Sequence, residues 1–212
     1  MKDFIIDVET LGITPDAIVV DISVLVFDLN DKRIPSFNEL VENGRRFKLS
    51  IESQKGIRKT TKATVDWWKS QDAEARKHLL PSKNDLTIEQ ALQSIESFLD
   101  EMGVVKSKSH GWCRGMSFDF PILSSLMRNV LGTDEIVELE LCRYYNQRDI
   151  RTAFEAYALV RNMTNIPLPE NALDGYVPHD SIHDCAKDVL MLMHARAYAM
   201  GTLSVPENEN GN

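Results

Sequence analysis

The sequence predicts an α/β fold in one domain, and three observations lead to this prediction. Segments rich in Val and Ile come early in the chain, and segments with helical spacing of apolar residues follow them. The 212 residues are 43% hydrophobic, which is enough for one core. There is no internal repeat and no linker-like stretch. We therefore expect a single domain over residues 1–203 and a polar, flexible tail over 204–212.

Three strands are expected before the first long helix. Residues 4–9 form a short apolar run that ends in Asp7-Val8-Glu9, and residues 17–27 have the Val and Ile content of a buried strand. Residues 28–31 have the composition of a turn. Residues 47–51 alternate in hydrophobicity, which is typical of an edge strand. This order indicates an opening meander.

Helices are expected to dominate the rest of the chain. Apolar residues spaced by three and four predict a helix over about 88–102, with a capping box at Thr87 and Gln90 and a stop at Gly103. A short strand is expected at 109–113. Further helices are expected at about 120–131, around 150–158 and at about 182–200.

Composition excludes several classes of protein. No apolar run approaches the ~18–20 residues that cross a bilayer, and the N-terminus lacks the layout of a signal peptide. Cys113, Cys142 and Cys185 are widely spaced and odd in number, so neither a disulfide framework nor a zinc knuckle is indicated. We expect a cytoplasmic protein with no membrane partner, and no protein partner can be predicted.

The distribution of charge leaves nucleic-acid binding open. The chain has 24 Lys and Arg against 32 Asp and Glu, a net charge of −8, which disfavours non-specific binding to phosphate backbones. Residues 45–62 nevertheless hold seven basic residues and one acidic residue. This basic run is either a solvated surface or a guide for a phosphate backbone. A smaller cluster contains Arg143, Arg148 and Arg151.

Asp7 and Glu9 are the first candidates for chemistry. Residues two apart on a strand project from the same face, and both are carboxylates at the end of an apolar strand. Burying such a pair costs several kcal/mol unless cations compensate. Hard oxygen ligands on one face are suited to a divalent metal such as Mg²⁺. The alternative is that the strand ends at Asp7 and both side chains are solvated.

Two further segments carry candidate carboxylates. Asp119 lies where a loop enters a helix, between Phe118 and Phe120, and the alternative is that it only caps that helix. In residues 178–188, Asp180, Asp184 and Asp188 are four apart and share one helical face. His183 precedes Asp188 by five positions, or ~140° around an ideal helix. Geometry alone does not choose between Asp184 and Asp188.

Together these segments resemble the motifs of the DnaQ-like 3′→5′ exonucleases of the DEDDh group. Residues 7–13 resemble the first motif, Ser117-Phe118-Asp119 the second, and His183-x4-Asp188 the third. The sequence is also similar, over nearly the whole chain, to the exonuclease A group of T-even bacteriophages. This similarity includes residues 111–123, 146–152 and 181–188. One departure is Gly115, because many family members have Asn there.

The resemblance implies a ribonuclease H-like fold, in which a five-stranded mixed sheet with its first three strands antiparallel carries helices on its faces. It implies that two divalent cations, Mg²⁺ or Mn²⁺, are held by four carboxylates and that a histidine is the general base. The implied metal ligands are Asp7, Glu9, Asp119 and Asp188, and the implied base is His183. Expected substrate contacts are the backbone of Thr10 and Leu11, the side chain of Phe118, and Trp68 from the Trp67-Trp68 pair.

The function implied is hydrolysis of single-stranded DNA from its 3′ end to nucleoside 5′-monophosphates, in the cytoplasm of an infected bacterial host if the gene is viral. The alternatives are a 3′→5′ exoribonuclease of the same superfamily, an inactive nuclease fold that binds nucleic acid, and a metal phosphatase or endonuclease. Asp21 is expected to be structural, the Trp pair could instead fill the core, and the parts played by Asp149 and Asp184 stay open.

Overall fold

The protein folds around one five-stranded mixed sheet, described here from a computed structural model over residues 1–206. The strand order is β3-β2-β1-β4-β5. β1 is antiparallel to β2, and β2 to β3, while β1–β4 and β4–β5 are parallel pairs. This is the predicted topology, and the fold class is confirmed. The strands are β1 (Asp3–Thr10), β2 (Val19–Phe27), β3 (Gly44–Lys48), β4 (Gly111–Cys113) and β5 (Gln147–Asp149).

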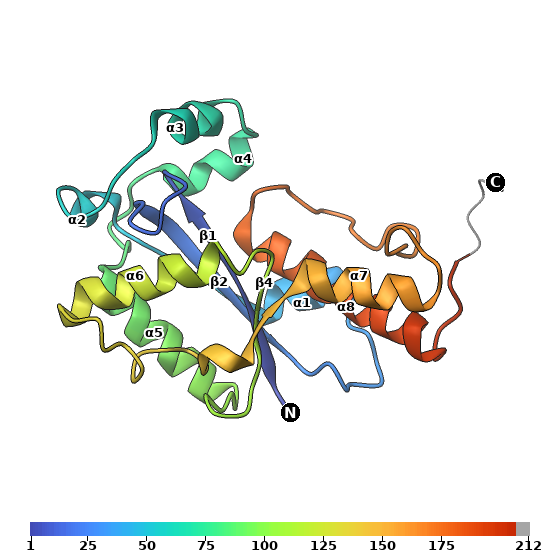
Figure 1. Cartoon of the computed structure of the whole chain (residues 1–212). Helices are drawn as coiled ribbons and strands as arrows, with labels where there is room; N and C mark the ends of the chain where they lie inside the picture. The colour runs from blue at the N-terminus through green and yellow to red at the C-terminus, as the bar shows by residue number, and fades with distance from the viewer. Residues whose placement is uncertain (207–212) are drawn as a thin grey trace.

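Helices cover both faces of the sheet. α5 and α6 lie on one face, and α1, α7 and α8 lie on the other (Figure 1). A smaller group of helices, α3, α4 and η1, lies beyond the end of β1. The helical segments are α1 (Phe37–Asn43), α2 (Ile51–Gln54), α3 (Lys62–Lys69), α4 (Ala73–Arg76), η1 (Lys77–Leu79), α5 (Ile88–Glu101), α6 (Asp119–Leu131), η2 (Tyr144–Asn146), α7 (Ile150–Val160) and α8 (Ser181–Met200).

β1 carries an uninterrupted apolar run, residues 4–6, because helices cover both of its faces. Phe4, Ile6 and Val8 belong to the core cluster under α5 and α6. Ile5, on the opposite face, packs in the cluster under α1 and α8. Side chains alternate along a strand, so the residues two and four positions beyond Ile5 also face α8. The two carboxylates at the end of β1 therefore project toward the start of that helix.

Most long elements lie where the sequence places them. The capping box of Thr87 and Gln90 starts α5, and Gly132 ends α6 in the left-handed region at φ +65°. Asp149 caps α7 by accepting a hydrogen bond from the Thr152 amide at 2.9 Å. It also accepts one from the Met116 amide at 3.2 Å, which ties down the loop that leads into α6. This capping is the structural role left open for Asp149.

The prediction for the third strand was wrong by three residues. β3 begins at Gly44 rather than at residue 47, and α2 already starts at Ile51. The sequence reasoning also missed α1, although Ser36 and Glu39 form a capping box at its start. Short elements of this kind carry too few apolar positions to show a clear period.

The three cysteines are free and buried. No helix among residues 1–206 is both long and apolar enough to cross a membrane. Apart from Ser204, Val205 and Pro206, the predicted tail lies outside the described residues. The single domain over residues 1–203 stays a prediction.

Gly44 marks the closest approach of β3 to α8 and yields a stability test. A Cβ at this position would lie 2.1 Å from Cδ1 of Ile182, which is itself buried. We expect Gly44→Ala to lower the free energy of unfolding by about 1–3 kcal/mol through overpacking. Adding Ile182→Val, which removes Cδ1, should restore part of that loss in a urea titration. Additive losses in the double variant would contradict this account.

Candidate active site

Three elements bring carboxylates together at the C-terminal end of β1. Asp7 and Glu9 project from β1 toward α8, and Glu9 stands opposite Asp21 in the register of β1 with β2. Asp119 enters from the first turn of α6, and Asp184 from the first turn of α8. The charges of Asp119 and Asp184 each raise the pKa of both Asp7 and Glu9, so all four carboxylates act on one another.

Asp119 lies where β1 extends beyond its pairing with β4. β4 pairs with β1 only at Phe4 and Ile5, so the later amides on that side of β1 have no strand partner. The Val8 amide instead donates to Oδ1 of Asp119 at 3.2 Å. Asp119 is 4% exposed and lies inside α6, while Phe118 takes the N-cap position without a side-chain cap bond. Asp119 is therefore more than a helix cap, because it links α6 to the strand between Asp7 and Glu9.

A histidine joins the carboxylates, but it is His179. Glu9, His179 and Asp184 each offer a ligand atom, and these atoms lie within 4.8 Å of one another. Over residues 1–206 this is the one such group of three or more His, Cys, Asp or Glu side chains. The His179 amide also donates to Oδ2 of Asp184 at 3.0 Å. Glu9 and Asp184 are half-buried, and His179 is exposed.

The structure does not bring His183, the predicted base, into this group. Its Nδ1 accepts a hydrogen bond from the Val177 amide at 3.0 Å. Its ring packs edge-on against Phe37 of α1, with the centroids 5.4 Å apart. Neighbouring residues on a helix point ~100° apart, so His183 cannot face the site that Asp184 faces. His183 supports the packing of the loop before α8 instead.

Asp188, the predicted fourth ligand, is 2% exposed and bound by Arg114. Nε of Arg114 donates to Oδ2 of Asp188 at 2.8 Å and to Oδ1 at 3.0 Å, and its NH2 group also donates to Oδ1. The charge of Asp188 still raises the pKa of Asp7, so it lies near the cluster. The Asp188 carboxylate is thus held by a guanidinium, whereas that of Asp184, although it pairs with Lys187 at 2.9 Å, lies within 4.8 Å of the ligand atoms of Glu9 and His179.

The pair that the structure groups with Glu9 has a signal of its own in the sequence. His179 and Asp184 have the same spacing, His-x4-Asp, as His183 and Asp188, and the two patterns overlap. The resemblance was assigned to the second of them. Only the loop conformation separates the two, because His179 precedes α8 at φ +61° whereas His183 lies within its first turn.

The electrostatics of the cluster call for cations. Burial raises the pKa of Asp7 and of Glu9 well above the ordinary range, and the neighbouring carboxylates raise both further. Burial also raises the pKa of Asp119 to about 7. Hard carboxylate oxygens that repel one another in this way fit divalent cations such as Mg²⁺ or Mn²⁺. The donor set therefore fits a divalent metal centre.

Asp21 and Asp180 are two further aspartates beside the cluster, and both act on the pKa of Glu9. Asp21 is 1% exposed and accepts a hydrogen bond from Oγ of Ser181 at 2.5 Å. Asp180 caps α8 through the His183 amide, pairs with Arg46, and lies 3.3 Å from Nε2 of His78. Burial opposes ionisation of Asp180, but His78 and Arg46 lower its pKa to about 2. The structural role predicted for Asp21 agrees with these contacts.

A pocket of about 370 Å³ opens beside Glu9 and holds some of the expected substrate contacts. Phe118 and Thr10 are part of its lining. Leu11 is not, and its amide and carbonyl are already bonded to the Ile18 carbonyl and the Thr61 amide. Residues 62–79, which contain α3, α4 and η1 and are called the arm below, contribute the other wall. The lining is Val8, Glu9, Thr10, Gly12, Ile13, Ala63, Thr64, Trp67 and Phe118.

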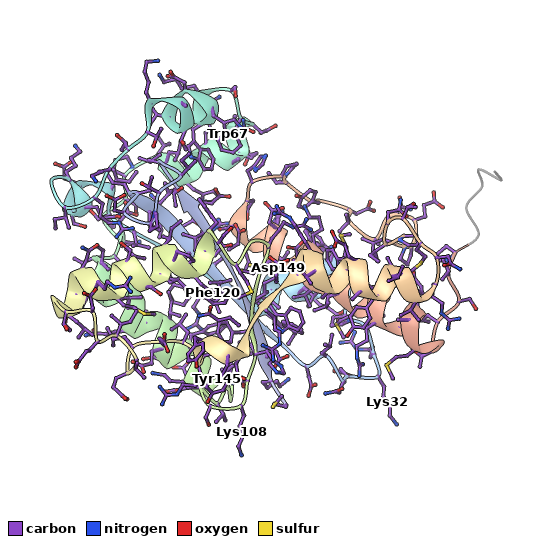
Figure 2. All side chains as sticks on the ribbon, in the orientation of Figure 1. Lys32, Trp67, Lys108, Phe120, Tyr145 and Asp149 are labelled. Atoms are coloured by element: carbon purple, nitrogen blue, oxygen red, sulfur yellow. The ribbon has the colours of Figure 1, made fainter. Side chains whose placement is uncertain are left out.

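The expectation for Trp68 was wrong. Trp68 is 2% exposed and donates from Nε1 to the Thr10 carbonyl at 2.8 Å, so its ring is not available to a nucleobase. Trp67 is 40% exposed and lines the pocket. Figure 2 labels Trp67 in the arm beyond the end of β1. Adjacent helical residues diverge by ~100°, so only one of the pair can reach this side.

The basic run of residues 45–62 does not form a free cationic surface. Arg58 is 5% exposed and donates to the carbonyls of Ala17 and Pro15 and to the side chains of Ser125 and Asn129. Each of the other six basic residues lies within 4.0 Å of an acidic group. The pairs are Arg45–Glu101, Arg46–Asp180, Lys48–Asp85, Lys55–Glu52, Lys59–Asp16 and Lys62–Asp66. A guiding role for this run is therefore not supported.

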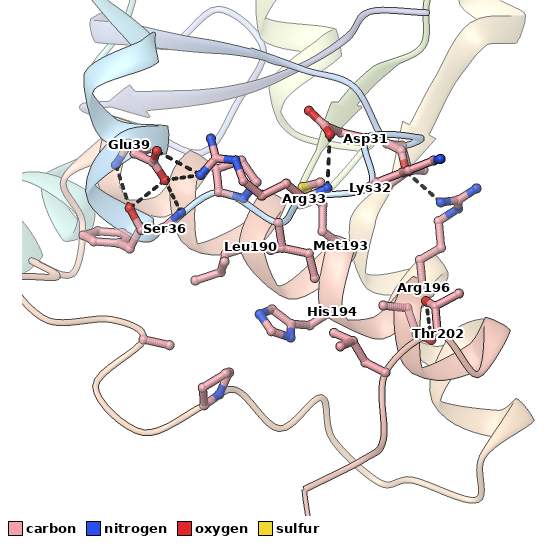
Figure 3. Close-up of a pocket in the computed structure, with 18 of the residues that line it drawn as sticks. Asp31, Lys32, Arg33, Ser36, Glu39, Leu190, Met193, His194, Arg196 and Thr202 are labelled. Carbon is pink, nitrogen blue, oxygen red and sulfur yellow. Dashed lines mark hydrogen bonds and ion pairs between the residues drawn. The ribbon is translucent and has the colours of Figure 1, made fainter.

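A larger pocket of about 970 Å³ lies away from the carboxylates, between the 29–39 segment and the C-terminal half of α8 (Figure 3). Its walls include Leu190, Met193 and His194 of α8. None of the residues of the carboxylate cluster lines it. The larger pocket is therefore separate from the carboxylate cluster, whereas the smaller one adjoins it at Glu9.

The fold and the carboxylate cluster define a nuclease of the ribonuclease H-like class, and comparisons with known proteins agree. Residues 2–194 match the model of a family described as the 3′-5′ exoribonuclease Rv2179c-like domain. The chain is also 47% identical to the exodeoxyribonuclease of Enterobacteria phage T4, over 99% of this chain and 95% of that protein. The chain belongs to this family of 3′→5′ exonucleases, within the DnaQ-like superfamily that the motifs indicated.

Solved structures support the fold alone. The cell-death related nuclease 4 (CRN-4) superposes with a TM-score of 0.58 at 14% identity, over 94% of this chain and 64% of that one. The nuclease domain of 3′hExo, described as a DEDDh family member, gives a TM-score of 0.50 at 13% identity over 97% of this chain and 96% of that one. Both agree with the expected ribonuclease H-like fold, while the family match and the relative with 47% identity make the protein an enzyme, a nuclease.

The raised pKa of Asp119 predicts how pH acts on the metal-free protein. Because the folded state holds a proton on Asp119 up to about pH 7 and the unfolded chain releases it near pH 4, stability falls as pH rises between these values. Asp119→Asn should therefore raise the free energy of unfolding at pH 8 by about 1–4 kcal/mol in EDTA. Thermal melts at pH 5 and pH 8 measure this, and a variant less stable than the parent at pH 8 would contradict it.

Proposed function

We propose that the protein is a divalent-metal-dependent 3′→5′ exonuclease that releases nucleoside 5′-monophosphates from single-stranded DNA. The observation that carries the proposal is the grouping of Glu9, His179 and Asp184 within 4.8 Å, beside Asp7 and Asp119. A histidine beside several carboxylates supplies both a metal centre and a proton acceptor. DNA is favoured because the relative with 47% identity is described as an exodeoxyribonuclease.

In this proposal Asp7, Glu9, Asp119 and Asp184 hold two divalent cations, Mg²⁺ or Mn²⁺. When bound, such cations activate water for attack on phosphorus and stabilise the charge on the leaving oxygen. Asp7 is half-buried among the other carboxylates, which suits a ligand shared by both cations. Asp184 replaces Asp188 in this set because Arg114 already occupies the Asp188 carboxylate.

His179 is the proposed general base. Its side chain is exposed next to Glu9 and Asp184, where an incoming water molecule can reach it. The imidazole accepts the proton of the attacking water, the new bond forms to the phosphorus of the last nucleotide, and the 3′ oxygen of the preceding nucleotide leaves. His183 is not used in this proposal, since its Nδ1 is held by the Val177 amide.

The pocket of about 370 Å³ is the proposed site of the 3′-terminal nucleobase. Phe118 and Trp67 line it, and the aromatic ring of Phe118 can stack on any base without sequence preference. A single strand is favoured as substrate, because a paired 3′ end must first fray before its last base can enter the pocket. The second candidate is an exoribonuclease, favoured by the description of the matching family.

The choice between the two histidine–aspartate pairs can be tested directly. We expect Asp184→Asn and His179→Ala to lower the single-turnover rate with Mg²⁺ by 100-fold or more, since a metal ligand or a general base is lost. Asp188→Asn and His183→Ala serve as matched controls and should retain activity to within about 10-fold. The reverse pattern would assign the site to His183 and Asp188.

Metal dependence has a readout that does not require turnover. Mg²⁺ or Mn²⁺ should raise the melting temperature of the parent protein by several degrees, because cations bind only the folded cluster. The same addition should have little effect on a variant in which Asp7 and Asp184 are both replaced by Asn. A parent melting curve that does not respond to either cation would contradict the proposed centre.

Substrate class is tested with end-labelled oligomers of one sequence. We expect release of mononucleotides from the 3′ end of a deoxy oligomer to exceed release from the matching ribo oligomer, and single strands to be cut faster than blunt duplexes. Faster hydrolysis of the ribo oligomer would favour the exoribonuclease, and internal cuts would exclude an exonuclease.

A further inference from the structure

The arm contacts the proposed base through one aromatic ring. The centroid of Trp67 lies 4.8 Å from that of the His179 imidazole, and the two rings are nearly perpendicular, at 82°. Trp67 comes from α3 and His179 from the loop before α8, so the contact joins segments far apart in the sequence. Such edge-to-face pairs are attractive and fix the relative orientation of two rings.

Few other contacts hold the His179 ring. Its amide is anchored to Asp184, but among residues 1–206 no hydrogen bond to either of its ring nitrogens is found. Its backbone has φ +61°, a conformation that a residue with a Cβ adopts only when neighbouring contacts hold it. The contact with Trp67 is therefore the main restraint on the ring.

Trp67 is held firmly enough to act as that restraint. Its ring packs against Trp68 with a centroid distance of 5.1 Å. Trp68 is buried and hydrogen-bonded to the Thr10 carbonyl, one residue after Glu9. A second contact between the arm and the loop before α8 is the pair of His78 with Asp180, at 3.3 Å. The ring of Trp67 is thus fixed relative to the strand that carries Asp7 and Glu9.

We propose that Trp67 is a positioning residue that holds the His179 imidazole toward the carboxylate cluster. This inference rests on the proposed function, in which His179 is the general base. It differs from a stacking role for Trp67 toward the nucleobase, because its effect passes through His179 and acts on the chemical step. Binding of the DNA strand should then be nearly independent of the Trp67–His179 contact.

The first test compares three substitutions at this position. Trp67→Ala and Trp67→Leu remove the aromatic face, and Leu retains apolar bulk if Ala perturbs folding. Both should lower the single-turnover rate on single-stranded DNA on the order of 10-fold, as expected for loss of an aromatic pair, and should change KM by less than about twofold. Trp67→Phe should restore most of the rate. Tyr144→Ala removes an aromatic that is 73% exposed elsewhere and should leave the rate unchanged.

A double-mutant cycle separates positioning from stacking. If Trp67 acts through His179, Trp67→Ala should cause no further loss in a His179→Ala background. An equal loss in both backgrounds, or a change confined to KM, would overturn the inference while leaving the proposed function intact. Full activity of His179→Ala alone would instead overturn the role of His179 as general base within the proposed function, and the inference with it.

Discussion

Mutual repulsion among carboxylates at one end of β1 is the constraint on which the rest of the structure depends. Asp7 and Glu9 are forced onto one face by the geometry of a strand whose other residues fill two cores. Asp119 and Asp184 are brought to the same place by the starts of α6 and α8. Each of these positions costs stability in the absence of cations, as the raised pKa values of Asp7, Glu9 and Asp119 record. Burial of apolar side chains in the two cores on either side of the sheet offsets this loss of folding free energy.

The surroundings of the cluster limit which groups can take part. All three aspartates spaced along α8 have charged partners: Asp188 pairs with Arg114, and Asp180 pairs with Arg46 and His78. Asp184, between them, pairs with Lys187 and accepts a hydrogen bond from the Tyr176 hydroxyl, and it also faces Glu9. The helix thus presents three similar side chains to three different environments, and only one of these environments is shared with β1.

Sequence reasoning succeeded where a pattern extends over many residues. β1, β2, α5, α6 and α8 were predicted because long apolar runs or periods specify them, and Asp7 and Glu9 stand out as charges within such a run. It failed where the pattern is short, as for α1 and β5. Where the pattern is repeated, the sequence does not separate its copies: His-x4-Asp occurs at both 179 and 183, only the turn into α8 distinguishes them, and the structure groups His179 with Glu9. The exposure of Trp67 and burial of Trp68 likewise depend on how α3 packs, which no local pattern specifies.

The ion pairs within the basic run affect how strongly binding of a long polyanion depends on salt. Its cations between Arg45 and Lys62 already have acidic or carbonyl partners, so few are left to displace the ions condensed around a nucleic-acid strand. Affinity that comes from displaced ions falls steeply with ionic strength. The contribution of this run to binding a polyanion should therefore change little with salt concentration.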